Sequence, residues 1–372
     1  MRIPAADLRA QHEGLRQELR AAFDRVLDAS AFIQGPEVEA FEREFAAVCG
    51  VPHAVGVSNG TDALAMALRA LGVGAGDLVA VPAFTFVATA EAVCHVGARP
   101  LLVDIDPVSF TLDPDALRRT LRQYTVRAVI PVHLYGQPAA MDDITALAQE
   151  GGAVVIEDAA QAHGARYRGR RVGGLGRLGC FSFYPSKNLG ALGDGGAVTT
   201  HDADGAARLR LLRDHGQTAK YTHGTVGYNS RLDGLQAALL RVKLPHLDAW
   251  NTRRQAVAAA YHRGLAGLPG LTLPETVPDR EHVYHLFVVR CRERDALRAH
   301  LSDCGIATGI HYPAPLHLQP AFASLGHRPG DLPASEAAAR EVLALPLYPE
   351  LTDEAVAWVC DVVRAWVQER GA

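Results

Sequence analysis

The first fifty residues carry the hydrophobic spacing of amphipathic helices. Between residues 8 and 28, apolar side chains recur at helical intervals, at Leu8, Leu15, Leu19, Phe23 and Val26. Because a helical turn takes 3.6 residues, these positions share one face, and the pattern predicts a helix over 8–28. A Gly-Pro pair at 35–36 breaks the pattern, which resumes over 37–49.

From residue 54 onward, short apolar runs alternate with helical segments. The runs are 54–57, 78–81, 100–103, 126–132, 153–156, 180–183 and 196–199. Most are continuously hydrophobic instead of alternating with polar residues, which indicates strands covered on both faces. The pattern therefore predicts an α/β fold with a mainly parallel sheet flanked by helices.

Polar residues follow several of these runs, among them Asp104, His133, Asp158 and Tyr184. Ligands of open α/β sheets bind beyond the carboxyl ends of the strands. We therefore expect the functional site at this edge of the sheet.

The pattern of hydrophobic residues changes again after a long helical stretch, 232–265, which is interrupted near Pro245. A strand-like run at 285–290, a helix near 293–304 and a terminal helix at 353–368 follow it. We expect an N-terminal arm and large domain over 1–245, and a smaller α+β domain over 246–372.

The composition argues against a protein that binds nucleic acid or a membrane surface. Lysine and arginine number 37 against 41 aspartates and glutamates, so no basic excess points to nucleic acid or a membrane surface. No apolar run is long enough to span a bilayer, and the N-terminus lacks the apolar core of a signal peptide. The six cysteines form no C-x-x-C pair, and we expect them reduced and mostly buried. The cytoplasm is the expected location, and no metal site is predicted.

Lys187 is the most informative residue. It follows an apolar run and precedes a glycine-rich turn. An amine there can form a Schiff base with an aldehyde cofactor, provided that burial or a nearby cation keeps it partly neutral. The alternative is a solvated loop lysine. Only Asn188 and Asp194 add strong polarity over 182–196, which disfavours that alternative.

Asp158 and the pair Gly60-Thr61 complete a pattern typical of pyridoxal phosphate (PLP). A carboxylate at 158 can pair with the pyridine N–H of the cofactor. Gly60 and Thr61 precede a helical pattern, and a helix N-terminus suits a phosphate. Taken singly, Asp158 is better explained as a salt-bridge partner or helix cap, and Gly60-Thr61 is better explained as an ordinary N-cap.

Four more residues are candidates for the same site. The Ser182 hydroxyl can turn to the phosphate, and Phe86 can stack on the pyridine ring or simply pack in the core. Gln161 and His163 follow Asp158 and can reach the cofactor O3′ or its carboxylate partner, although a lone histidine is usually structural.

Eight motifs in order carry a family resemblance. They are SNGTDAL at 58–64, PAFTF at 82–86, VHLYG at 132–136, IEDAAQAHG at 156–164, FSFYPSKNLG at 181–190, GDGG at 193–196, GYNSRLD at 227–233 and IHYP at 310–313. In these motifs the chain resembles the DegT–DnrJ–StrS nucleotide-sugar aminotransferases, which are fold-type-I PLP enzymes. The resemblance covers nearly the whole chain.

The resemblance implies roles for individual residues. Lys187 matches the Schiff-base lysine, Asp158 the pyridine partner, and Ser182 with Gly60 and Thr61 the phosphate cup. Phe86 matches the ring-stacking position and Gln161 the O3′ neighbour. Asn229 matches an asparagine that reaches the cofactor phosphate of the other subunit, which implies a homodimer with shared sites.

Family members usually move the amino group of L-glutamate to a keto group on a nucleotide-linked sugar, and some act on a keto-inositol. This chain resembles the branch acting on dTDP-3-keto-6-deoxyhexoses, in deoxyaminosugar biosynthesis for an antibiotic or a surface glycan. The expected substrate contacts are Tyr184, Lys220, Tyr221, Arg231, His311 and Tyr312. Ser186 departs from that branch, which often has glycine there.

Several alternatives stay open. The ketone can lie at C4 instead of C3, and the nucleotide can be CDP, GDP or UDP. Sugar dehydratases of this fold replace the lysine by histidine, so Lys187 argues against that activity. A non-catalytic regulator or partner protein is disfavoured by the intact set of Lys187, Asp158, Ser182 and Asn229.

Overall fold

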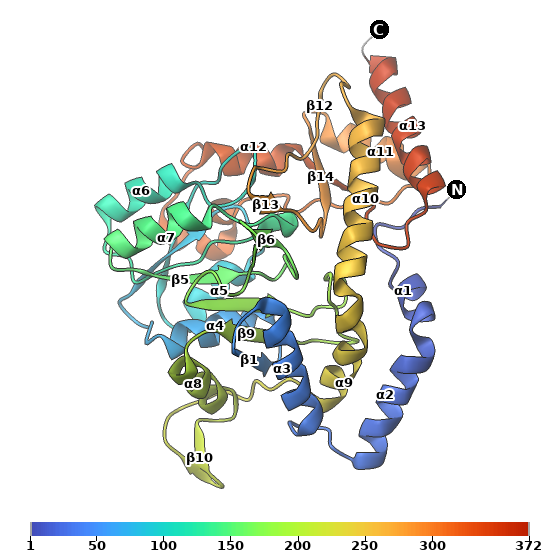
Figure 1. The fold of residues 1–372 in the computed structure, drawn as a ribbon. Helices are drawn as coiled ribbons and strands as arrows, with labels where there is room; N and C mark the ends of the chain where they lie inside the picture. Colours follow the sequence, from blue (N-terminus) through green and yellow to red (C-terminus); the bar gives the residue numbers. More distant parts are fainter. Residues whose placement is uncertain (1, 371–372) are drawn as a thin grey trace.

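A seven-stranded sheet forms the centre of the computed structural model (Figure 1). The structure describes residues 2–370. Its spatial order is β1-β9-β8-β5-β4-β2-β3. The strands are β1 His53–Val57, β9 Gly196–Thr200, β8 Leu178–Ser182, β5 Val154–Asp158, β4 Ala128–Val129, β2 Leu78–Pro82 and β3 Arg99–Val103.

Strand direction brings the candidate residues to one edge. The neighbours from β8 to β3 all pair in parallel, whereas β9 is antiparallel to both β1 and β8. Since two antiparallel pairings restore the direction, β1 runs the same way as β8. The carboxyl ends of β1, β2, β5 and β8 therefore meet at one edge, and each leads into a segment with predicted site residues.

Helices cover both faces of the sheet, which explains the continuous hydrophobic runs. One face packs on α4, α5 and α8, and the other on α3, α6, α7 and α9. Their bounds are α3 Pro36–Cys49, α4 Gly60–Ala70, α5 Ala88–His95, α6 Pro114–Gln123, α7 Met141–Glu150, α8 Ala203–Arg213 and α9 Gly234–Lys243.

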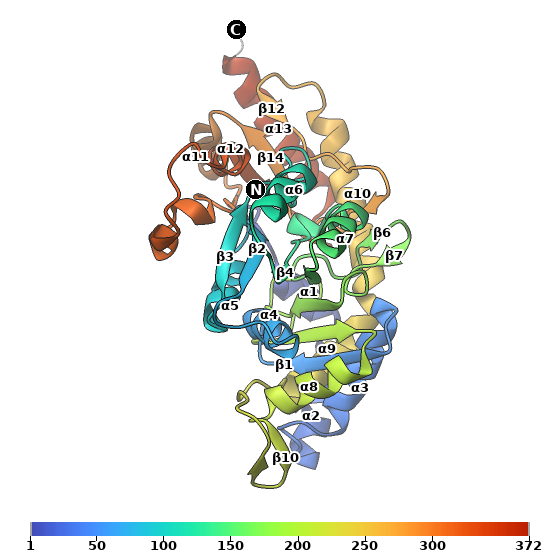
Figure 2. The same cartoon turned by 90° about the vertical axis from the view of Figure 1, so that its left-hand side faces the viewer.

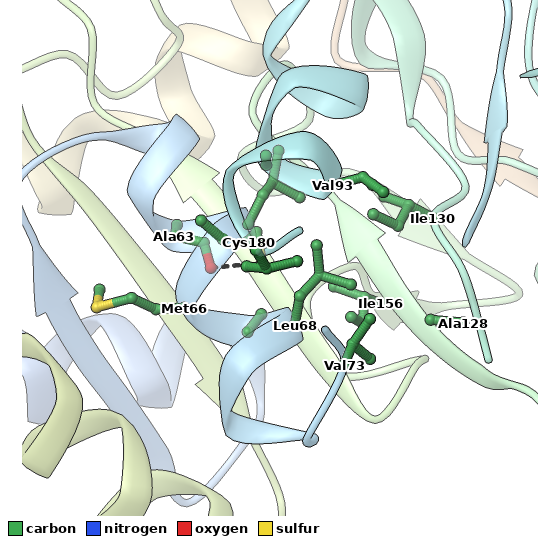
Figure 3. Close-up of a cluster of buried hydrophobic side chains, with 14 of the residues drawn as sticks. Ala63, Met66, Leu68, Val73, Val93, Ala128, Ile130, Ile156 and Cys180 are labelled. Atoms are coloured by element: carbon green, nitrogen blue, oxygen red, sulfur yellow. Dashed lines mark hydrogen bonds between the residues drawn. The ribbon is translucent and has the colours of Figure 1, made fainter. Parts of the chain in front are cut away.

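The core under α4 shows how the layers fit (Figure 3). Ile130 reaches it from the segment after β4, Ile156 from β5 and Cys180 from β8. Met66 and Leu68 come from α4. The Cys180 thiol lies 3.5 Å from the carbonyl of Ala63, within hydrogen-bonding distance. Four of the six cysteines are buried, as predicted, and none of the six is paired in a disulfide.

The N-terminal arm differs from the predicted single helix. It contains two helices, α1 Leu8–Gly14 and α2 Arg16–Ala29, because Leu15 between them leaves the helical conformation. Leu15, Leu19 and Val26 pack against α9, and Ile3 reaches the C-terminal part of the chain. The predicted strand 126–132 is also shortened, to β4, because Pro131 has no N–H to offer its neighbour.

The chain continues through the predicted boundary in three helical pieces. A short 3₁₀ helix, Leu244–His246, joins α9 to α10 Leu247–Leu265 and contains Pro245. A C-terminal sheet of order β12-β14-β15 follows, with its own buried cluster. Its elements are β12 Leu271–Thr272, β14 Phe287–Cys291, α11 Arg294–Asp303, α12 Pro333–Glu341, β15 Val342–Leu345 and α13 Asp353–Arg370. The division at residue 245 stays a prediction.

Two smaller features complete the fold. β6 Arg166–Tyr167 pairs with β7 Arg170–Arg171 and with β13 Arg280–Glu281. The hairpin of β10 Gln217–Ala219 and β11 Thr222–His223 projects from the molecule beyond α8 (Figures 1 and 2). In residues 2–370, no helix combines the length and apolar character needed to cross a membrane.

Candidate active site

A cavity of about 720 Å³ opens at the carboxyl edge of the central sheet. Segments that follow β1, β2, β5 and β8 line it, together with residues 285–286 and 311–312. Ten of the fifteen residues predicted from the sequence are in its wall: Gly60, Thr61, Phe86, Asp158, Gln161, Ser182, Tyr184, Lys187, His311 and Tyr312.

Lys187 lies in the loop after β8, in the cavity wall and partly accessible from it. Its backbone N–H donates to the carbonyl of Tyr184 over 2.8 Å, which closes a tight turn. The surrounding protein disfavours the ammonium form and lowers the pKa of Lys187 to about 8, although the carboxylate of Asp158 opposes this shift. A useful fraction of the amine is therefore neutral near physiological pH and able to attack an aldehyde.

Asp158 ends β5 with only 5 % of its surface exposed, and it lines the same cavity. The Thr89 hydroxyl donates to Oδ2 over 2.8 Å, and the Ala160 N–H donates to Oδ1 over 3.2 Å. Burial raises the pKa of Asp158, whereas these two hydrogen bonds favour the carboxylate. The group suits a cationic N–H inside the cavity, since such a partner would offset the cost of burying its charge.

The N-terminus of α4 forms another part of the cavity wall. Asn59 caps it, since its side chain accepts from the Asp62 N–H over 2.8 Å. A Cβ on Gly60 would lie 2.6 Å from the Cβ of Ser182, so glycine allows the helix to approach the end of β8 closely. The result is a shallow cradle of helix N–H groups and the Ser182 hydroxyl, which suits a phosphate.

Phe86, Tyr312 and Gln161 form another part of the wall. Phe86 is 54 % exposed, and its ring centroid lies 5.8 Å from that of Tyr312. Gln161 accepts from the Tyr135 N–H over 2.7 Å and donates to the Tyr312 hydroxyl over 3.1 Å. An exposed aromatic face and an anchored amide fit the stacking and O3′ positions of the prediction.

His163 lies behind the cavity and not in its wall. Its ring packs against Phe181 and Phe183, with centroids 5.3 and 5.8 Å away. Burial, aided by the charge of Lys187, lowers its pKa to about 3, so the ring is neutral. Its contacts are those of a core aromatic, and its predicted role beside the cofactor stays a prediction.

The remaining four predicted residues lie outside this cavity. Lys220 and Tyr221 are at the tip of the β10–β11 hairpin, where Tyr221 is 83 % exposed and the Lys220 ammonium lies 5.4 Å from its ring centroid. Asn229 is exposed on the strand-like segment that returns from the hairpin and pairs with Asp214. Arg231 donates to Asp214 over 2.8 Å. Asn229 is predicted to contact the cofactor phosphate of a second subunit, and the other three residues are predicted to contact the substrate. These contacts stay predictions.

Sequence reasoning missed three residues next to the reactive groups: Thr89, Asn188 and His285. Thr89 holds Asp158, and Asn188 is buried beside Lys187. His285 lines the cavity from the segment that enters β14. One signal was present, since His285 is a polar residue placed directly before an apolar strand.

A family model matches residues 14–364 of the chain, and it describes the DegT/DnrJ/EryC1/StrS aminotransferase family. One relative, dTDP-3-amino-3,4,6-trideoxy-alpha-D-glucose transaminase of Streptomyces venezuelae, is 53 % identical over 99 % of this chain and 97 % of its own length. Another, the erythromycin biosynthesis sensory transduction protein EryC1 of Saccharopolyspora erythraea, is 52 % identical over 98 % of this chain and 100 % of its own length.

Solved structures agree with these relatives. S. venezuelae DesV in complex with a ketimine intermediate superposes with a TM-score of 0.96, at 53 % identity, over 99 % of each chain. NtdA of Bacillus subtilis, with bound cofactor PMP, superposes with a TM-score of 0.88, at 32 % identity, over 95 % of this chain and 82 % of its own.

These findings confirm the predicted fold class and the predicted aminotransferase, and the PMP-bound relative supports the predicted cofactor. The match spans nearly the whole chain, and seven of its eight motifs contribute residues to one cavity, whereas the GYNSRLD motif at 227–233 lies outside it. This chain belongs to the DegT/DnrJ/EryC1/StrS aminotransferase family.

Proposed function

We propose that this protein is a PLP-dependent aminotransferase that moves the amino group of L-glutamate to the keto group of a dTDP-3-keto-6-deoxyhexose. The observation that carries the proposal is the convergence of Lys187, Asp158 and the Gly60 cradle on one cavity. An amine of lowered pKa, a buried carboxylate and a helix N-terminus fit the aldehyde, the ring nitrogen and the phosphate of PLP.

Each residue of the site has its own role in the proposed reaction. Lys187 would hold the cofactor in the resting enzyme and, once released, would move a proton at the substrate α-carbon. Asp158 would keep the ring nitrogen of the cofactor protonated, and Thr89 orients Asp158. The N-terminus of α4 and Ser182 would hold the phosphate. When bound, PLP supplies the electron sink and carries the amino group.

The substrate class follows from the relatives. The 53 % identical relative is named as a transaminase of a dTDP-linked 3-amino sugar, which supports both the nucleotide and the C3 position for this chain. The name of the EryC1 relative supports a role in antibiotic biosynthesis. A 4-keto sugar or a keto-inositol is the alternative substrate, and the cytoplasm stays the predicted location.

The charges of the cavity support a homodimer with shared sites. Among residues 2–370, Lys187 is the only lysine in the cavity wall and no arginine lines it, whereas Asp62, Glu91, Asp158 and Asp194 do. A nucleotide diphosphate and glutamate are both anions and need further cations. The projecting Lys220, with Asn229 on the returning segment, fits the role of completing the site of a partner subunit.

Mass spectrometry tests the proposed reaction directly. The protein is incubated with PLP, [15N]glutamate and dTDP-3-keto-6-deoxyglucose, in parallel with the 4-keto isomer and with keto-inositol. We expect 15N in an amino sugar product from the 3-keto substrate and none with Lys187→Ala. Amination of only the 4-keto sugar or the inositol would move the proposal to that substrate. PLP binding without any glutamate turnover would favour the non-catalytic alternative.

A further inference from the structure

A cluster of buried amides surrounds the residue next to Lys187. The Asn188 side chain is 2 % exposed, and its Nδ2 donates to Asn251 Oδ1 over 2.8 Å and to the carbonyl of Val283 over 3.1 Å. Its Oδ1 lies 3.2 Å from Nδ1 of His285. One amide therefore joins the lysine loop to α10 and to the segment that enters β14.

Two backbone carbonyls fix the orientation of both amides. The Val283 carbonyl only accepts, so the NH₂ group of Asn188 must face it. Asn251 likewise donates its own Nδ2 to the carbonyl of His163 over 2.8 Å, which leaves Asn251 Oδ1 to accept from Asn188. A flip of either amide would place two acceptors against each other.

The tautomer of His285 follows from this arrangement. Asn188 presents a carbonyl oxygen to Nδ1, so Nδ1 must carry the hydrogen and donate it. Burial, together with the positive charge of Lys187, holds the pKa of His285 well below its usual range, so the ring is neutral. Its Nε2 therefore has a free lone pair, and no hydrogen bond within residues 2–370 engages that atom.

α10 holds the outer side of the cluster. Asn251 and Arg254 lie one helical turn apart, and the Arg254 guanidinium donates to the carbonyls of Tyr284 and His285 over 3.3 and 3.4 Å. Gln255 adds a bond to the carbonyl of His282 over 3.0 Å. The segment with His285 is thus fixed to the same helix that fixes Asn188.

We propose that Asn188, Asn251 and His285 form a clamp that positions Lys187, in which His285 acts as an Nδ1-protonated, neutral imidazole that donates to Asn188. The clamp keeps the lysine amine at the cavity wall and limits its access to water. The role of the amine in transamination rests on the proposed function, whereas the clamp itself is testable without cofactor.

A matched pair of substitutions separates the two nitrogens of His285. In His285→Asn the amide nitrogen can replace Nδ1 and still donate to Asn188. In His285→Gln the amide falls near the Nε2 position, and the donor to Asn188 is lost. Labelling of Lys187 by an amine-reactive anhydride, followed by mass spectrometry across a pH series, gives the ionisation midpoint of the amine in cofactor-free protein.

We expect the wild type and His285→Asn to show a midpoint near 8. In His285→Gln and Asn188→Ala the midpoint should move toward about 10.4, the value of an exposed lysine. Equal midpoints for the two His285 variants, or an unchanged midpoint in folded Asn188→Ala, would overturn the clamp. Failure of the sugar reaction alone would leave this result intact.

A second measurement needs no folded variant of Asn188. Long-range 1H–15N correlation spectra of histidine-labelled wild-type protein distinguish the two imidazole tautomers, and the signal missing from His285→Asn identifies His285. We expect a hydrogen on Nδ1 and a bare Nε2. A hydrogen on Nε2 would contradict the proposal.

Discussion

Burial of Lys187 destabilises the folded protein as long as the amine is protonated. Its pKa falls to about 8 in the folded protein because burial disfavours the ammonium form. An unfolded lysine keeps its proton to about pH 10.4. Between these values the unfolded chain binds more protons than the native one, so stability rises with pH through this range.

This cost predicts the behaviour of Lys187→Met in cofactor-free protein. At pH 7 the free energy of unfolding of the variant should exceed that of the wild type by up to about 3 kcal/mol. The reason is that the pKa of Lys187 differs by slightly more than about 2 between the folded and the unfolded chain. The difference should shrink between pH 8 and 10. Urea unfolding at pH 7 and pH 9.5 measures it. Lys220→Met, at an exposed position, serves as the control and should show no such difference.

Asp158 carries a charge that the amide of asparagine lacks. Asp158→Asn keeps an acceptor for Thr89 but no longer stabilises a protonated ring nitrogen. We expect the glutamate half-reaction to slow by about tenfold or more, since a charged hydrogen bond contributes roughly 1.5–3 kcal/mol. Stopped-flow absorbance measures this rate.

A matched control comes from the same sheet edge. Asp104 follows β3, and its carboxylate accepts from the Ala334 and Ser335 N–H groups of α12. Asp104→Asn should lower stability but leave the half-reaction rate unchanged. Equal slowing in both variants would point to a general loss of structure instead of a role for Asp158.

At the level of single residues, the sequence predicted the groups that follow strands and missed those that act through long-range pairing. Lys187 and Asp158 were found because each follows an apolar run. Thr89 and His285 were not, because their partners lie 69 and 97 residues away along the chain. No local pattern encodes such contacts.

Among the elements, the contact between α4 and β8 is the most sensitive to side-chain size. Gly60→Ala would place a methyl group 2.6 Å from the Ser182 Cβ, so the helix end or the strand must shift. We expect a loss of about 1–3 kcal/mol in stability and weaker PLP binding, because the phosphate cradle opens. Thermal unfolding and PLP titration measure the two effects.

Gly14→Ala is the control for this substitution. A Cβ at Gly14 would meet nothing within 4 Å, and the position lies at the end of α1, far along the chain from the cradle. It should leave PLP binding unchanged and alter stability by less than about 1 kcal/mol. If Gly60→Ala bound PLP as tightly as Gly14→Ala, the cradle assignment would be wrong.

Most strands and helices were predictable from hydrophobic patterning, and the exceptions have local causes. Leu15 fits the helical period of 8–28 but lies at a break between α1 and α2. The run 126–132 is apolar throughout, yet Pro131 interrupts its pairing. The antiparallel direction of β9 depends on how the chain returns after Lys187, which hydrophobicity does not record.

For the whole molecule, the proposed shared sites predict complementation between two inactive variants. Lys187→Ala damages a site from within, and Asn229→Ala damages the site of the partner. A mixed dimer then contains one site with both defects and one intact site. Random mixing should restore about a quarter of wild-type activity, since half of the dimers are mixed.

Activity is measured after co-expression of the two variants with different affinity tags. Mixing the purified Lys187→Ala variant with itself is the control and should restore none. An absence of recovery in isolated mixed dimers would mean that each subunit builds its site alone. The exposed β10–β11 hairpin would then need another role.

The most direct test of the central claim is the absorption spectrum of the purified protein with PLP, before and after addition of L-glutamate. We expect a visible band that depends on Lys187 and is absent from Lys187→Ala, and glutamate should replace it with the band of the pyridoxamine form. A wild-type protein that binds no PLP, or whose band glutamate leaves unchanged, would contradict a glutamate-dependent aminotransferase.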